Sequence, residues 1–67
     1  MNKFADRLKE LRQEKNLTQY ELSKKINIST ACINRWEKNL GIPNIDSIII
    51  LCQFFGCSSD YLIGIED

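Results

Sequence analysis

Histidine is absent from the sequence, proline occurs once and glycine three times, and no apolar run is long enough to cross a bilayer. Without histidine, the chain lacks the side chain that most often serves as a general base near neutral pH. It also contains neither a glycine-rich phosphate loop nor a nucleophile elbow. We therefore do not expect an enzyme. The charged first residues do not resemble a signal peptide, so we expect a cytoplasmic protein with no membrane partner.

Cysteine is scarce as well, and its pattern does not predict a metal site. Cys32, Cys52 and Cys57 are odd in number, and their spacings match no common arrangement of metal ligands. We interpret them as small apolar residues of a core in a reducing compartment, with a redox role for Cys57 as the alternative. No metal and no other cofactor is expected.

Net charge is also absent, because nine Lys and Arg residues balance nine Asp and Glu residues. Yet all nine bases lie in residues 1–38, where five acids leave a net charge of +4, and residues 39–67 carry −4. This asymmetry hints at one end that binds anions, although short domains often divide their charges unevenly. With 67 residues, of which 43% are hydrophobic, we expect a single domain over residues 1–67 with one core.

Apolar residues recur at helical spacing, and no segment alternates as a strand would, so the predicted fold class is all-α. The expected helices cover residues 3–15, 18–25, 29–37 and 45–55, followed by a short fifth helix capped by Ser58. Thr18 and Glu21 form a capping-box pattern, and Asn27 tolerates the left-handed backbone that ends a helix. Helix 45–55 is apolar on more than one side, so we expect much of its circumference to be buried at the centre of the core.

The second and third expected helices are joined by a turn of three to four residues, and the third has a polar outward face. This arrangement is typical of a helix-turn-helix, although any helical hairpin could show it. More specific evidence is in the residues Leu17-Thr18-Gln19-x-Glu21-Leu22-Ser23-x-Lys25-Ile26-Asn27-Ile28-Ser29, Ile33-x-Arg35-Trp36-Glu37-x-Asn39 with Pro43, and Ile48-x-x-Leu51-Cys52-x-x-Phe55-Gly56-Cys57-Ser58-x-x-Tyr61-Leu62.

Over roughly residues 4 to 64, this pattern resembles the Cro/repressor-type, or XRE-like, DNA-binding domain. The resemblance implies a compact five-helix bundle of the lambda-repressor-like type. It also implies a sequence-specific transcriptional regulator, expected to be a repressor that binds double-stranded DNA as a homodimer. Asn27 and Asn39 stand where the family commonly has glycine, and both tolerate a left-handed backbone.

In such a domain, side chains near the start of helix 29–37 would enter the major groove. We expect base contacts from Thr30, Ala31, Asn34 and Arg35. Arg35 can bind O6 and N7 of guanine, Asn34 can pair with adenine, and Ala31 can meet a thymine methyl. The alternatives are an Arg35 that is solvated or bound to phosphate, and an Asn34 that is only a polar surface residue.

Phosphate contacts are expected where helices begin, because backbone amides and the helix dipole favour anions there. Thr18 and Gln19 open the second helix and fit this role. The resemblance places Gln19 on one side of the groove and Lys38 and Asn39 on the other, with Ser29 at the cap of the third helix. For Thr18 and Ser29, a plain capping role is the alternative.

The resemblance also implies a partly buried ion pair between Arg12 and Glu37 that joins the first helix to the end of the third. Such a pair would orient the recognition helix rather than read DNA. Trp36 follows Ile33 by three residues on the inward side, so we expect it in the core rather than as a platform for bases.

Ile50 and Phe54, four residues apart on the fourth helix, are apolar where the family tends to carry polar or small residues. With Tyr61 they would form a patch at which a homodimer could assemble, the alternative being a slightly larger core. The rival function is a protein-interaction module, such as an antitoxin-like or anti-repressor subunit, that uses this flank. Only DNA binding would weaken steeply with salt.

Overall fold

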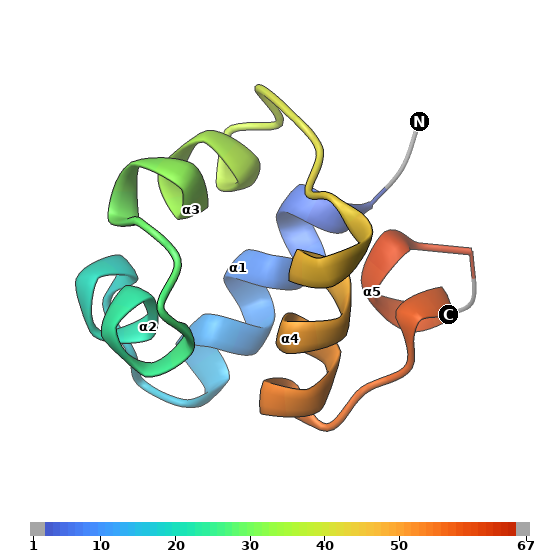
Figure 1. The fold of residues 1–67 in the computed structure, drawn as a ribbon. Helices are drawn as coiled ribbons and strands as arrows, with labels where there is room; N and C mark the ends of the chain where they lie inside the picture. Colours follow the sequence, from blue (N-terminus) through green and yellow to red (C-terminus); the bar gives the residue numbers. More distant parts are fainter. Residues whose placement is uncertain (1–2, 66–67) are drawn as a thin grey trace.

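The computed structural model of the protein describes residues 3–65, and that part of the chain forms five helices and no strand (Figure 1). In chain order they are α1 (Phe4–Glu14), α2 (Gln19–Ile26), α3 (Thr30–Glu37), α4 (Ile45–Phe55) and α5 (Ser59–Ile63). The all-α prediction is confirmed, and each predicted boundary lies within a residue of the observed one. Glu66 and Asp67, which contribute to the acidic half of the sequence, lie outside the described residues. None of the described helices is long and apolar enough to span a membrane.

Local side chains define where α2, α3, α4 and α5 begin, which is why these starts could be predicted from the sequence. The amino ends of α2, α3, α4 and α5 each have a side-chain oxygen that accepts a hydrogen bond from the backbone N–H three residues later. These caps satisfy amides that have no partner within their own helix. The four capping residues are Thr18, Ser29, Asn44 and Ser58.

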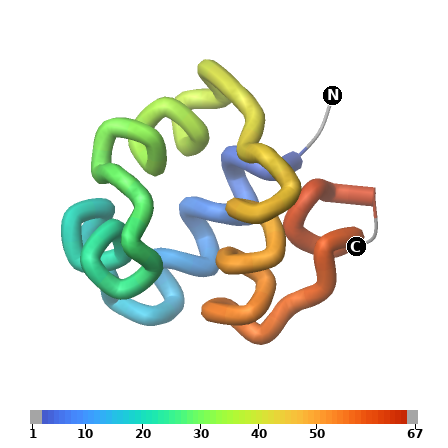
Figure 2. The backbone as a smooth tube through the Cα atoms, viewed as in Figure 1, coloured from blue at the N-terminus to red at the C-terminus, as the bar shows by residue number. Residues whose placement is uncertain are grey.

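The core draws one fully buried residue from every helix. These residues, in chain order, are Leu8, Leu22, Ile33, Leu51 and Leu62. Trp36 is also buried and meets Phe4 edge to face, with ring centroids 6.1 Å apart, which confirms its predicted place in the core. The backbone trace shows α1 running behind α4 through the middle of the molecule (Figure 2). Helix α1 packs against both α3 and α5, so α1 is the central helix.

The expectation that α4 is buried around much of its circumference is wrong. Leu51 is its only buried residue, whereas Ile45 is 77% exposed, Ile49 47% and Ile50 37%. One side of α4 packs against α2 and α5, and no described element covers its outer side. The isoleucines on the side away from α2 and α5 therefore stay exposed among the described residues.

Asparagines occupy three of the tight turns. Asn16, Asn27 and Asn39 have φ angles of 56°, 58° and 60°, and each follows the end of a helix. Asparagine adopts this left-handed region at less cost than most residues other than glycine. The two substitutions for glycine that the resemblance singled out, at positions 27 and 39, therefore preserve the backbone path.

The three cysteines are free and half-buried, and all three pack at the edge of the core, as expected of small apolar residues. Within residues 3–65, no group of His, Cys, Asp and Glu side chains is placed to hold a metal ion.

Candidate nucleic-acid interface

A three-residue turn sets the angle between α2 and α3. The backbone N–H groups of Asn27 and Ile28 both donate to the carbonyl of Ser23, which closes the end of α2. Ser29 follows directly, and its hydroxyl accepts from the N–H of Cys32, 3.1 Å away, to start α3. Because one helix is closed and the next is capped within three residues, the turn holds the two helices in a fixed relation.

A pair of hydroxyl groups links α2 to α3 directly. The Oγ1 of Thr30 donates to the Oγ of Ser23 over 3.0 Å, and Ser23 in turn donates to the carbonyl of Tyr20 over 2.7 Å. Ser23 is buried, and its small side chain allows the two helices to approach closely. The Thr30 hydroxyl is therefore already engaged as a donor inside the domain.

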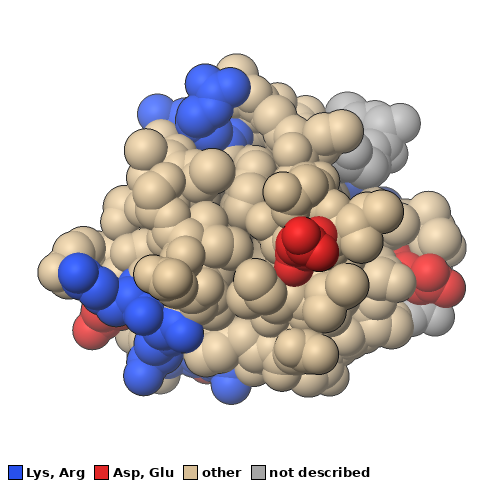
Figure 3. All heavy atoms as spheres, in the orientation of Figure 1, with Lys and Arg blue, Asp and Glu red and all other residues tan. Residues whose placement is uncertain are grey.

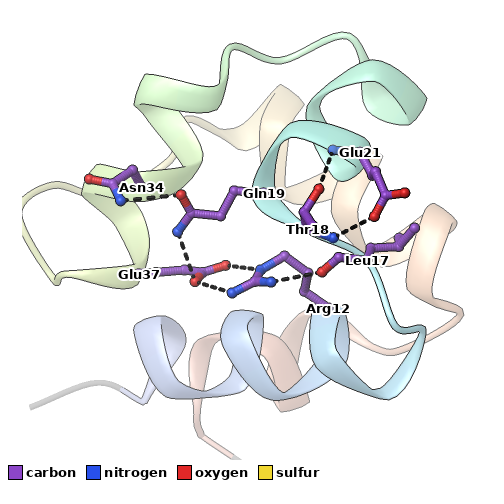
Figure 4. A network of polar contacts seen from close by, with 7 residues as sticks. All are labelled: Arg12, Leu17, Thr18, Gln19, Glu21, Asn34 and Glu37. Atoms are coloured by element: carbon purple, nitrogen blue, oxygen red, sulfur yellow. Dashed lines mark hydrogen bonds and ion pairs between the residues drawn. The ribbon is translucent and has the colours of Figure 1, made fainter.

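A chain of polar contacts ties the exposed side of α3 to α1 (Figure 4). Asn34 Nδ2 donates to Gln19 Oε1 over 3.2 Å, and Gln19 Nε2 donates to Glu37 Oε1 over 3.1 Å. Glu37 also accepts from Arg12, whose Nε lies 2.7 Å from Oε2 and whose Nη2 lies 2.9 Å from Oε1. Arg12 completes the chain by donating from Nη1 to the carbonyl of Leu17 over 2.7 Å.

The ion pair at the middle of this network is shielded from solvent. The side chains of Arg12 and Glu37 are only 12% and 5% exposed. Hydrogen bonding to the Glu37 carboxylate raises the pKa of Arg12 above its ordinary value, so the guanidinium stays charged. The predicted ion pair is thus confirmed. Since it joins α1 to the last residue of α3, it fixes the direction of α3 relative to the core.

The outward side of α3 is small and polar. Ala31 and Arg35 are exposed one helical turn apart, and Asn34 is half-buried beside them. The Arg35 guanidinium folds toward the loop after α3, where Nη2 donates to the carbonyl of Leu40 over 2.9 Å. Lys38 and Asn39 are exposed at the end of the same helix. Ala31, Asn34 and Arg35 thus lie along α3, and Lys38 and Asn39 directly follow its last residue.

Thr18 and Ser29 both act as caps, the role given above as the alternative to a phosphate contact. In the capping box of α2, the Thr18 N–H donates to Glu21 Oε1 over 2.8 Å, and the Glu21 N–H donates to Thr18 Oγ1 over 3.0 Å. Each capping oxygen therefore accepts one hydrogen bond, while its own O–H group can still donate to a further partner.

A family model described as Helix-turn-helix matches residues 8–62. The chain belongs to the XRE-type helix-turn-helix family. It is 36% identical over 64 residues to the HTH-type transcriptional activator BcrR of Enterococcus faecalis, covering 96% of this chain and 31% of that protein. It is 34% identical over 64 residues to the HTH-type transcriptional regulator ImmR of Bacillus subtilis (strain 168), covering 96% of this chain and 50% of that protein.

Among solved structures, the chain is similar to the SOS-response transcriptional repressor LexA from Eubacterium rectale, with a TM-score of 0.83 and 28% identity. That match covers 90% of this chain and 64% of the other. The helix-turn-helix chain thus spans half or less of the length of the two curated relatives named above. The lambda-repressor-like bundle that the sequence predicted is confirmed.

The residues proposed as a dimer patch do not all meet in this helix-turn-helix domain. Phe54 lies at one end of α1, where the Lys15 ammonium is 5.4 Å from its ring centroid. Tyr61 lies near the other end, with the Arg7 guanidinium 4.0 Å from its ring centroid. Lys15 and Arg7 are eight residues apart, about 12 Å along a helix. Ile50 is 37% exposed and precedes Phe54 by one turn of α4, so these two residues lie on the same side of that helix.

Charge is distributed unevenly over the helix-turn-helix domain. Lys and Arg side chains appear over α2 and beside the connection from α3 to α4, and acidic atoms lie over α4 and α5 and at the outer edge of α2 (Figure 3). Between these groups, much of the visible surface is uncharged. Among the described residues, the exposed large hydrophobic side chains include five in the loop after α3 and on α4, namely Leu40, Ile42, Ile45, Ile49 and Ile50, together with Tyr20 on α2 and Ile65 after α5.

Proposed function

We propose that this chain is a sequence-specific DNA-binding domain that inserts α3 into the major groove as a homodimer and represses transcription in the cytoplasm. The observation that carries the proposal is the outward face of α3, where Ala31 and Arg35 are exposed. The ion pair between Arg12 and Glu37 holds the helix behind that face in a fixed direction. A helix of this kind, with small and polar side chains, fits a groove about 12 Å wide.

Arg35 is the proposed guanine reader. Its hydrogen bond to the Leu40 carbonyl is exposed and single, so the side chain can exchange it for the paired acceptors O6 and N7. Asn34 donates one of its two Nδ2 hydrogens to Gln19. Its second Nδ2 hydrogen can donate to an adenine, and its Oδ1 can accept from one. Thr30 retains acceptor capacity at its hydroxyl, and Ala31 supplies the methyl that meets thymine.

Phosphate binding is proposed for the residues on either side of this face. Gln19 and Thr18 stand at the amino end of α2, and Ser29 stands at that of α3, where the helix dipole favours anions. Lys38 and Asn39 lie at the opposite end of α3 and would bind the DNA backbone on the other side of the major groove. These contacts position the domain without selecting a sequence.

The deciding experiment compares Arg35→Ala with Lys38→Ala on an operator selected from random duplex DNA and on random DNA. Loss of a paired guanine contact worth about 1–3 kcal/mol should weaken operator binding about 5- to 150-fold per half-site. Arg35→Ala should leave the affinity for random DNA nearly unchanged. Lys38→Ala, as the matched loss of one exposed positive charge, should weaken both targets alike and reduce the salt dependence. Equal losses for Arg35→Ala on both targets would make that residue a phosphate contact.

A protein-interaction module is the second candidate, favoured by the exposed isoleucines at positions 42, 45 and 49. A module of this kind needs no affinity for nucleic acid. Titrating random duplex DNA at increasing salt separates the two, because each phosphate contact adds to a steep fall in affinity. A reporter placed downstream of the selected operator then distinguishes repression from activation.

A further inference from the structure

One row of side chains along α4 begins with an acidic residue, continues with an apolar one and ends with an aromatic one. Asp46, Ile50 and Phe54 follow one another at intervals of four residues, so they lie along the same side of the helix. Asp46 is exposed, Ile50 is 37% exposed, and Phe54 is half-buried. Because α4 runs from residue 45 to residue 55, Ile50 is its midpoint. Asp46 and Phe54 each lie about 6 Å from it along the helix axis.

The aromatic end of this row opens into a basic hollow. A cavity of about 470 Å³ is lined by Phe54 together with the turn between α1 and α2 and the last turn of α2. Lys15 and Lys25 contribute two positive charges to its lining, and Glu14 contributes one negative charge. The hollow thus carries a net positive charge, whereas the other end of the row carries the Asp46 carboxylate.

We propose that two copies of this chain pair through α4, antiparallel, around a two-fold axis that passes beside Ile50. In this arrangement, Ile50 of one copy contacts Ile50 of the other. Each Asp46 carboxylate reaches the Lys15 and Lys25 side chains that flank Phe54 of the other copy. This pairing rests on the homodimer of the proposed function, and it specifies which surface the two copies share and which residues face each other across it.

The choice of a second copy as the partner follows from the symmetry of the row. A two-fold interface presents the same surface on both partners, so each charge must meet its opposite at an equal distance from the axis. The row on α4 fits this condition, since Asp46 and Phe54 are four residues on either side of Ile50, and Lys15 and Lys25 line the hollow beside Phe54. Ile45 and Ile49, on the neighbouring side of α4, extend the apolar surface that would be covered.

The test is a charge exchange between two variants. Asp46→Lys places a lysine opposite the two basic residues of an identical partner. Lys15→Glu with Lys25→Glu places two carboxylates opposite Asp46. Each variant alone should associate about tenfold or more weakly than the wild-type chain in sedimentation equilibrium, because attraction becomes repulsion at both ends of the interface. An equimolar mixture should recover wild-type association, because opposite charges meet at both ends of the mixed dimer.

Asp60→Lys is the matched control, since Asp60 is an exposed acid in the first turn of α5 and lies off the α4 row. It should leave association unchanged, and circular dichroism should show all variants folded. A mixture that associates no better than its components would overturn the α4 pairing, as would a control as damaging as Asp46→Lys. Duplex binding is measured separately on the wild-type chain. If the mixture of variants does not recover association but the wild-type chain binds duplex DNA in a salt-dependent way, only the α4 interface is rejected. A successful exchange without duplex binding rejects only the DNA-binding function.

Discussion

Replacing Glu37 by alanine should be among the most destabilising changes on the polar side of α3. The substitution removes both carboxylate oxygens that bind the Arg12 guanidinium at 2.7 and 2.9 Å, together with the acceptor for Gln19. Arg12 would keep its hydrogen bond to the Leu17 carbonyl, but its charge would be stranded with the side chain only 12% exposed.

The expected loss follows from this geometry. Breaking a fully buried pair costs about 3–5 kcal/mol, whereas an exposed pair contributes about 0–1 kcal/mol. Because the pair is nearly but not completely buried, we expect Glu37→Ala to lower the free energy of unfolding by about 3 kcal/mol. For a domain of this size, that corresponds to a fall in melting temperature of about 12–24 °C. Glu10→Ala, an exposed acid on α1, should change stability by less than about 0.5 kcal/mol.

Thermal and urea unfolding followed by circular dichroism measure these differences, and a double-mutant cycle tests the cause. Arg12→Met combined with Glu37→Leu leaves no stranded charge and should be more stable than Glu37→Ala by at least about 1 kcal/mol. A loss below about 1 kcal/mol for Glu37→Ala would refute the reasoning. So would an Arg12→Met/Glu37→Leu variant whose loss of stability equals the sum of the losses of Arg12→Met and Glu37→Leu measured separately.

Two further predictions concern glycine and cysteine. Gly64→Ala should destabilise the domain by about 2 kcal/mol or more, because an added Cβ would lie 2.7 Å from the backbone nitrogen of Lys3 at a φ of +89°. Gly56→Ala should cost only about 1 kcal/mol in the same unfolding assay, since its φ is +69° but nothing lies within 4 Å of the added atom. Equal losses would contradict the steric argument. Burial, and then the neighbouring Cys52 thiol, raise the pKa of Cys57 above its ordinary value. Iodoacetamide should therefore modify Cys57 more slowly than a free cysteine near pH 8. As the pH is raised further, the rate for Cys57 should keep increasing after the rate for the free cysteine has become constant. Mass spectrometry measures both rates.

Features decided within a few residues of chain could be predicted from the sequence. Thr18 and Ser29 cap helices where their local pattern placed them, and Asn27 ends α2 in the left-handed conformation. The helix boundaries followed because caps and apolar periods act over three or four residues. The ion pair of Arg12 and Glu37 needed the family resemblance, since 25 residues separate the two side chains.

Features that depend on how helices are placed relative to one another could not be predicted. The apolar residues of α4 show which sides could be buried, but not which side another helix covers, and Ile45 and Ile49 proved to be exposed. Phe54 and Tyr61 were grouped by residue type, whereas they lie near opposite ends of α1. No spacing pattern predicted that Arg35 would reach the Leu40 carbonyl, because a long side chain can select among several acceptors.

The close approach of Lys3 to Gly64 has a consequence for the topology of the domain. Residues before α1 and after α5 lie side by side, at the corner where α1 and α5 pack together. A short linker could join them without moving any helix, and the exposed loop between α3 and α4 offers a place to open the chain instead. Such a circular permutant would begin with α4 and end with α3. It would keep α2 and α3 contiguous and place the new carboxyl terminus beside the proposed DNA-binding face.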